Sequence, residues 1–147
     1  MTPSSSATHP HLALPLLGIG DSLVALDRPA EALSYLERGT ALQDDASSDR
    51  AYGLTSLARC LVALRRFAPA VTPLERAVTL REAKGDDPLE LARSRLLLAR
   101  ALWGGTGDRD RAVAEARQAQ RAFAAAGEEH AADRAEADAW LAAHARR

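Results

Sequence analysis

The 147-residue sequence contains one cysteine, one lysine and few aromatic residues. Because Cys60 has no second cysteine to pair with, an internal disulfide and a cysteine-based metal site are both excluded. Aromatic residues make up 4% of the chain and apolar residues 47%, so any core must consist largely of Ala, Leu and Val. The length corresponds to one domain that can bury a sizeable core.

An excess of charge and long apolar runs are missing as well. The formal net charge is −1, so bulk nucleic-acid binding has no electrostatic basis. No run of 18 apolar residues is present that could span a membrane. The opening MTPSSSAT has neither the basic start nor the apolar segment of a signal peptide. These absences predict a cytoplasmic protein with no nucleic-acid partner and no membrane partner.

Strand patterns are absent, whereas helical patterns recur along the chain. No stretch alternates apolar and polar residues with β-branched or aromatic enrichment. The spacing i, i+3, i+4, i+7, which lines one face of a helix, occurs three times. Its members are Leu16, Ile19, Gly20 and Leu23; Leu54, Leu57, Ala58 and Leu61; and Arg95, Leu98, Ala99 and Leu102.

Proline, glycine and aspartate separate the helical segments. Pro29 and Pro69 fit the first turn of a helix, and the glycine-rich stretch 104–107 ends one helix before Asp108 caps the next. Pro73 lies a full turn inside a helical pattern, so it should bend that helix or move its start. The sequence therefore predicts an all-α protein with seven helices. Their ranges are 11–26, 29–43, 49–64, 68–84, 88–104, 109–126 and 128–145.

Two stretches of the chain are nearly the same. Residues 26–42 read LDRPAEALSYLERGTAL, and residues 64–80 read LRRFAPAVTPLERAVTL. Ala32, Ala70 and Ala112 hold the same place in successive helix pairs, at steps of 38 and 42 residues. Self-similarity at this period is typical of helical repeat arrays, in which each pair buries its apolar face against the next. Ala70 and Ala77 should therefore lie in tight helix–helix contacts.

The pattern within each pair resembles the tetratricopeptide repeat (TPR). That family has a large residue, Leu-Gly and another large residue on the first helix, and small, bulky and small residues on the second. The matching positions are Leu16, Ile19, Gly20, Leu23, Ala32, Leu36 and Gly39; Leu54, Leu57, Ala58, Leu61, Ala70, Leu74 and Ala77; and Arg95, Leu98, Ala99, Leu102, Ala112, Ala116 and Ala119. The third repeat departs at Arg95, where an apolar residue is usual, and has one extra residue in its turn.

The resemblance implies a right-handed α-solenoid of three helix-turn-helix repeats with a C-terminal capping helix. We expect a disordered tail over 1–8 and one TPR-like domain over 9–147, with repeats at about 9–45, 49–86 and 88–126. The cap, over 128–145, should pack through an alanine stripe, which consists of Ala131, Ala135, Ala139 and Ala142, with Trp140 beside it. Because the chain starts just before a repeat boundary, we expect it to be a fragment or a short member of a larger family.

Two features point to a more specific relationship. The spacing above 34 and the His9-Pro10 lead-in resemble the kinesin-light-chain-like variant common in bacteria. The Leu-Glu-Arg blocks at 36–38 and 74–76, and Asp87-Pro88 before a first helix, resemble the repeats that follow the catalytic domain of bacterial serine/threonine protein kinases. The resemblance implies a non-catalytic interaction or scaffold module, in one version the regulatory part of such a kinase.

Motifs for catalysis or cofactor binding are missing. Gly18-Ile19-Gly20 lacks the third glycine and the preceding strand of a dinucleotide site, and no kinase motif is present. The cluster around His130 fits a solvated first helical turn better than a metal site, since metal sites need several ligands at fixed spacing. Cys60 fits a buried thiol. The sequence therefore predicts no enzyme, no cofactor and no metal.

A partner-binding groove is the remaining candidate site. In such arrays the first helices line a concave surface, and the positions that would face it include Asp21, Tyr52, Thr55, Arg59, Arg93, Leu96, Arg100 and Trp103. Arginine, tyrosine and tryptophan are enriched in binding hot spots, and guanidinium groups favour an acidic or C-terminal peptide. In the alternative interpretation these arginines are solvated and Trp103 only closes the third pair.

Two functions stay open at this point. The first is a protein-interaction module that binds a protein or peptide in the groove. The second is an effector-sensing domain of a bacterial transcription regulator, which would need a closed pocket for a small molecule near Trp103. The identity of the partner and the oligomeric state do not follow from the sequence.

Overall fold

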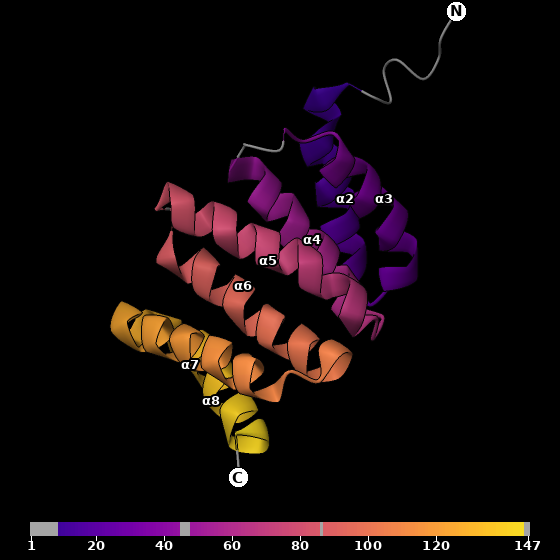
Figure 1. Cartoon of the computed structure of the whole chain (residues 1–147). Helices are drawn as coiled ribbons and strands as arrows, with labels where there is room; N and C mark the ends of the chain where they lie inside the picture. The colour runs from indigo at the N-terminus through magenta and orange to yellow at the C-terminus, as the bar shows by residue number, and fades with distance from the viewer. Residues whose placement is uncertain (1–8, 45–47, 86, 146–147) are drawn as a thin grey trace, which may run out of the picture.

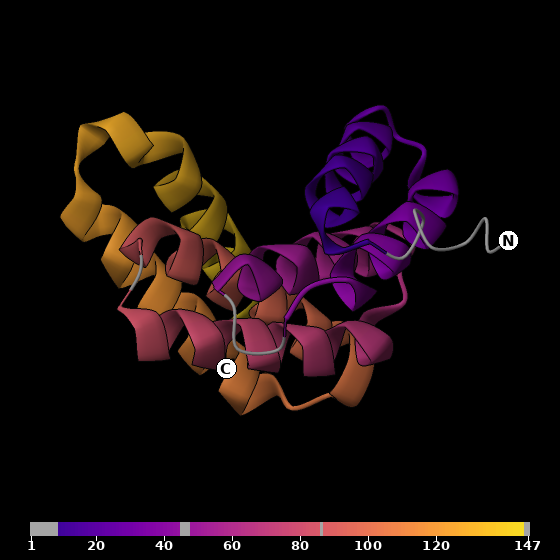
Figure 2. The same ribbon diagram turned by 90° about the horizontal axis from the view of Figure 1, so that it is seen from above.

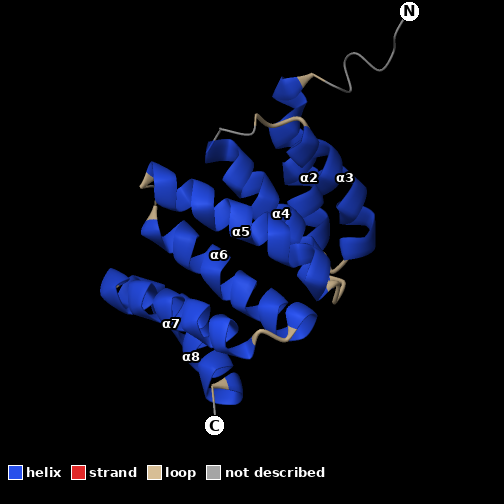
Figure 3. Cartoon of the chain, in the orientation of Figure 1, coloured by secondary structure: helices blue, strands red, loops and turns tan. Residues whose placement is uncertain are grey.

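The computed structural model describes residues 9–44, 48–85 and 87–145, and all regular structure in these ranges is helical (Figures 1 and 3). The α-helices are α2 (Ala13–Ala25), α3 (Pro29–Ala41), α4 (Ser48–Ala63), α5 (Phe67–Lys84), α6 (Pro88–Ala101), α7 (Arg109–Ala126) and α8 (Ala131–His144). The expectation of an all-α fold is confirmed, and the bounds of these seven helices agree with the predicted ones within three residues. The expected tail over 1–8 lies outside the described residues.

Helices that follow one another pack as antiparallel pairs, and the pairs stack in chain order. The most extensive contacts are those of α2 with α3, α4 with α5 and α6 with α7. The second helix of each pair then packs against the first helix of the next, as α3 does against α4 and α5 against α6. Figure 2 shows the resulting curved stack, in which α2 and α8 stand on either side of the surface that α4 and α6 form.

The turn inside each pair has a residue in the left-handed backbone conformation at the same position. Asp27 has φ 61°, Arg65 has φ 60° and Gly107 has φ 73°, and these positions follow the steps of 38 and 42 residues. In the first turn the amide of Arg28 donates to the carbonyl of Leu23, 2.8 Å away, which is the capping pattern of a Schellman motif. Asp27 and Arg65 thus occupy a conformation that glycine adopts with less strain.

The strain at Arg65 gives a testable difference between two variants. Arg65→Gly and Arg65→Ala both remove the guanidinium, which lies 5.4 Å from the centre of the Phe67 ring, but only glycine relieves the left-handed backbone. We expect Arg65→Gly to be more stable than Arg65→Ala by about 1 kcal/mol. Urea unfolding of the two proteins measures this, and equal midpoints would show that the turn is not strained.

The third turn accommodates its extra residue by widening. After α6 the chain continues as a π-helical turn, Leu102–Thr106, and the amide of Gly107 donates to the carbonyl of Leu102 over 2.9 Å. A Cβ on Gly105 would come within 2.5 Å of the backbone nitrogen of Ala68. This position therefore needs glycine, because the turn lies directly on the start of α5.

Small residues allow the helices to approach closely. Ala32, Ala70, Ala77 and Ala112 are all fully buried, which confirms the predicted contacts of Ala70 and Ala77. Pro73 does not move the start of α5, which begins at Phe67 and continues past it. Cys60 is buried as expected, and its thiol donates to the carbonyl of Pro29 over 3.1 Å.

Arg95 replaces the usual apolar residue without leaving a buried charge unpaired. Its guanidinium pairs with Glu115 of α7 at 2.9 Å and with Glu82 of α5, while its side chain is only 12% exposed. The second helices on both sides therefore neutralise the one charged residue at a core position of the third repeat.

The predicted face of the capping helix is wrong. The alanine stripe of Ala131, Ala135, Ala139 and Ala142 is exposed, whereas Ala137 and Leu141 are buried and Trp140 is partly buried. Alanine occurs on every side of α8, so an alanine stripe does not mark one face. Leu141 and Trp140 remove more apolar area from water than alanine does, and they determine which face packs.

Candidate functional site on the concave surface

The concave surface is formed by the first helix of each pair together with α8. It contains a hollow of about 280 Å³ between α4, α6, α7 and α8. The residues that line the hollow are Arg59, Arg93, Leu96, Leu97, Arg100, Phe123, Asp133 and Glu136. Four of the predicted groove residues, Arg59, Arg93, Leu96 and Arg100, are therefore brought together.

Two of the three arginines in the hollow already have carboxylate partners on α8. Arg93 pairs with Asp133 at 2.8 Å and with Glu90 of its own helix at 2.7 Å. Arg100 pairs with Glu136 at 2.6 Å. Hydrogen bonding to Asp133 holds the pKa of the Arg93 guanidinium above its usual value, and Arg93 in turn lowers the pKa of Asp133. Thus α8 presents its own acidic residues to the basic side of α6.

Arg59 differs from the other two arginines. Its side chain is exposed, and no hydrogen bond or ion pair joins it to any residue that the structure describes. Leu96, Leu97 and Phe123, which line the hollow and are nearly or fully buried, form its apolar base. The site therefore combines an unpaired cation, an apolar base and two ion pairs.

Asp21, Tyr52 and Thr55 lie outside the hollow. The Tyr52 hydroxyl donates to the Asp21 carboxylate, which also accepts a hydrogen bond from Ser56 at 3.2 Å. Partial burial, followed by this hydrogen bond, raises the pKa of Tyr52. Thr55 is only 4% exposed and bonds with Ser94 between α4 and α6, so its placement on the groove surface was wrong.

Trp103 belongs to an aromatic cluster at the C-terminal end of the array. Its ring meets Trp140 edge-on at 5.7 Å and His144 at 4.8 Å, and the Arg109 guanidinium lies 4.5 Å from its centre. Trp103 does not line the hollow. The interpretation in which Trp103 closes the third pair agrees better with these contacts.

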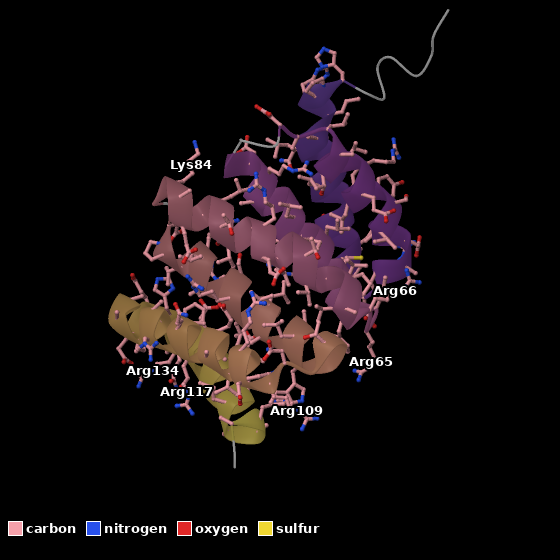
Figure 4. All side chains as sticks on the ribbon, viewed as in Figure 1. Arg65, Arg66, Lys84, Arg109, Arg117 and Arg134 are labelled. Atoms are coloured by element: carbon pink, nitrogen blue, oxygen red, sulfur yellow. The ribbon has the colours of Figure 1, made fainter. Side chains whose placement is uncertain are left out.

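Sequence reasoning missed the half of the hollow that α7 and α8 contribute. Asp133 and Glu136, spaced i, i+3, could have indicated an acidic face that meets the arginines of α6. Phe123 gave no such signal, because one aromatic residue near a helix end fits core packing equally well. In Figure 4 the labelled Arg66 and Lys84 lie at the two ends of α5, at the edge of the array.

The described ranges contain neither a metal-binding cluster of side chains nor a membrane-spanning helix. Within the described ranges, no group of three or more His, Cys, Asp and Glu side chains could hold a metal ion. The His130 ring lies 3.6 Å from Glu129 and 3.9 Å from Asp133. Both are weak surface contacts. No helix in the described part of the chain is long and apolar enough to cross a membrane.

Comparison with known proteins identifies the fold. No family model and no curated protein matches the sequence. Among solved structures, the chain is similar to the nearly identical TPR-like repeats of a Podosopora anserina protein of the kinesin light chain type, with a TM-score of 0.77 and 22% identity over 92% of this chain and 66% of that one. A variant of the same protein matches with a TM-score of 0.77 and 23% identity. The chain thus spans about two thirds of these structures, and the expected TPR-like fold is confirmed.

Proposed function

We propose that this chain, a TPR-like helical repeat array, is a non-catalytic protein-interaction module that binds an acidic segment of a partner protein on its concave surface. The observation that carries this proposal is the convergence of Arg59, Arg93 and Arg100 on one hollow with an apolar base. Guanidinium groups pair with carboxylates in two-pronged geometry, and apolar side chains supply the buried contacts of a binding site.

The size and composition of the hollow favour a segment of protein over a small effector. At about 280 Å³ it lies at the lower limit of small-molecule pockets, and it is open to solvent on one side. The alternative of an effector-sensing regulator domain requires a closed pocket near Trp103, but Trp103 packs against Trp140 and His144. One large side chain of a partner fits the hollow, with its acidic neighbours reaching the arginines at the rim.

Binding should respond in opposite directions to two sets of substitutions. Arg59→Ala with Arg100→Ala removes two cations, so we expect an acidic partner to bind about tenfold more weakly or worse. Glu136→Gln releases Arg100 from its internal partner, so the same partner should bind more tightly. Pull-down from the source cytoplasm, followed by titration of the recovered partner at low salt and at 1 M salt, measures both effects.

Circular dichroism provides the control. Arg59 is exposed and Arg100 makes only a partly exposed ion pair with Glu136, so helicity should be unchanged. Binding should also weaken at 1 M salt, where the screening length is about 3 Å. If parent and double variant recover the same proteins in the same amounts, the arginine surface is only solvated. The partner would then have to bind on the convex side or at the loops.

We further propose that this module is the regulatory segment of a bacterial serine/threonine protein kinase. Its support is the resemblance carried by the Leu-Glu-Arg blocks and by His9-Pro10 and Asp87-Pro88. The full reading frame of the parent gene tests this setting, because a catalytic domain upstream would be required. Its absence would leave a stand-alone interaction module.

A further inference from the structure

Exposed apolar side chains concentrate on the first helix of the array. Within the described ranges, the exposed large hydrophobic residues are Leu14 (55%), Ile19 (46%), Leu26 (66%) and Tyr52 (38%). Three of these four lie on α2 or on the residue that caps it. Exposed apolar patches of this kind indicate interaction sites when they form one continuous surface.

The internal repeat shows what the exposed face of α2 corresponds to. A step of 38 residues maps one stripe of α2 onto one stripe of α4. The stripe on α2, here called the open stacking face, consists of Pro15, Gly18, Ile19, Ser22 and Leu26. Its counterparts on α4 are Gly53, Ser56, Leu57, Cys60 and Leu64. All five α2 residues are exposed, whereas every counterpart is buried or partly buried.

On α4 this stripe is covered by α3 and the residues that end it. The Thr40 hydroxyl donates to the carbonyl of Gly53 over 3.2 Å, and the Cys60 thiol donates to the carbonyl of Pro29 over 3.1 Å. A Cβ added to Gly53 would come within 2.1 Å of the Gln43 side chain. A Cβ added to Gly18 would meet nothing within 4 Å. The same backbone surface is thus packed in the second repeat and open in the first.

In the third repeat the corresponding stripe is packed as well. The corresponding residues of α6 are Ser94, Leu97, Leu98 and Ala101, and all four are buried. Leu97, Leu98 and Ala101 share one apolar cluster with Val71, Leu74 and Val78 of α5. Ser94 instead bonds with Thr55 of α4, and Leu97 also lines the hollow. Thus α5 covers α6 with apolar residues at i, i+3 and i+7, and the corresponding places on α3 are Leu33, Leu36 and Thr40.

We infer that the open stacking face binds the second helix of a further helix pair of this type. This interface would continue the one already formed by α3 on α4 and by α5 on α6. Residues 1–8 contain no Leu, Ile, Val or aromatic residue, so they cannot supply the apolar stripe. In a second copy, the covering faces of α3, α5 and α7 are already engaged by α4, α6 and α8.

A stapled helix tests this inference with a defined probe. The probe is a peptide with the sequence of residues 67–84, stapled between positions 72 and 76, which are exposed on α5. Because Pro73 lies between these positions, circular dichroism first checks that the stapled peptide is helical, so that an unfolded peptide does not explain a negative result. With the full chain, the peptide should slow hydrogen exchange of the α2 amides about tenfold at saturation. A peptide with Val78→Glu should give no protection, because it places a charge in the covering stripe.

Chain variants locate the binding site and separate it from the concave surface. Ile19→Glu should abolish the protection of α2, and its fold should be unchanged because Ile19 is exposed. Arg59→Ala should leave the protection as it is, because Arg59 belongs to the hollow and not to the open stacking face. Failure of the proposed acidic-segment site would therefore not affect this result.

Two results would overturn the inference. One is unchanged exchange of α2, or protection that persists in Ile19→Glu. The other is a concentration-dependent dimer in sedimentation equilibrium that Ile19→Glu removes, since the open stacking face would then join two copies of this chain. A monomer with peptide-dependent protection of α2 supports the inference.

Discussion

Ala77→Glu should lower the free energy of unfolding by about 3–5 kcal/mol, because it forces a longer, charged side chain into a fully buried contact between α4 and α5. Ala77 is fully buried in an apolar cluster with Ala51, Leu54 and Leu80, and none of these can neutralise a charge. A domain of this size has a total stability of about 5–15 kcal/mol, so the variant should be close to unfolding at room temperature. Urea unfolding followed by circular dichroism measures the difference.

Ala83→Glu is the matched control, since Ala83 is exposed on the same helix. It introduces the same side chain and the same helix propensity without burial, so its unfolding midpoint should stay close to that of the parent. Equal stability of Ala77→Glu and Ala83→Glu would contradict the packing of α5 on α4. The repeat assignment of α5 would then have to be abandoned.

Removal of α8 should have a still larger effect. A chain that ends at Gly127 loses Ala137, Trp140 and Leu141, and Phe123, which is 1% exposed in the complete fold, would become accessible to water. Arg93 and Arg100 would lose Asp133 and Glu136 at the same time. A solenoid with an uncovered end aggregates or unfolds without cooperativity. Thermal unfolding and light scattering should show both changes.

Two point variants test whether α8 stabilises the fold through its buried face. Ala137→Glu places a charge on the buried side of α8 and should reproduce much of the truncation, whereas Ala135→Glu lies on the exposed side and should be harmless. A truncated chain that stays monomeric and equally stable would show that α8 is an appendage. Equal behaviour of the two alanine variants would show that its packed face is still wrongly assigned.

The repeat, the helix bounds and the small-residue contacts could all be predicted from the amino-acid sequence. These are local or periodic properties: apolar spacing at 3.6 residues per turn, proline in the first turn and alanine at matching places at 32, 70 and 112. Such features require no knowledge of what lies across a helix interface.

Which groove residues are available to a partner could not be predicted, because it depends on contacts between distant helices. Arg100 meets Glu136 and Arg93 meets Asp133 across 36 and 40 positions of sequence, and these pairings depend on how α8 crosses the array. The buried side of α8 could not be chosen from an alanine-rich helix, because alanine contributes similar area on every side and Trp140 and Leu141 outweigh it. The burial of Thr55 was also unpredictable, because it results from the close packing of α4 on α6. Periodicity describes one helix and not the contact between two.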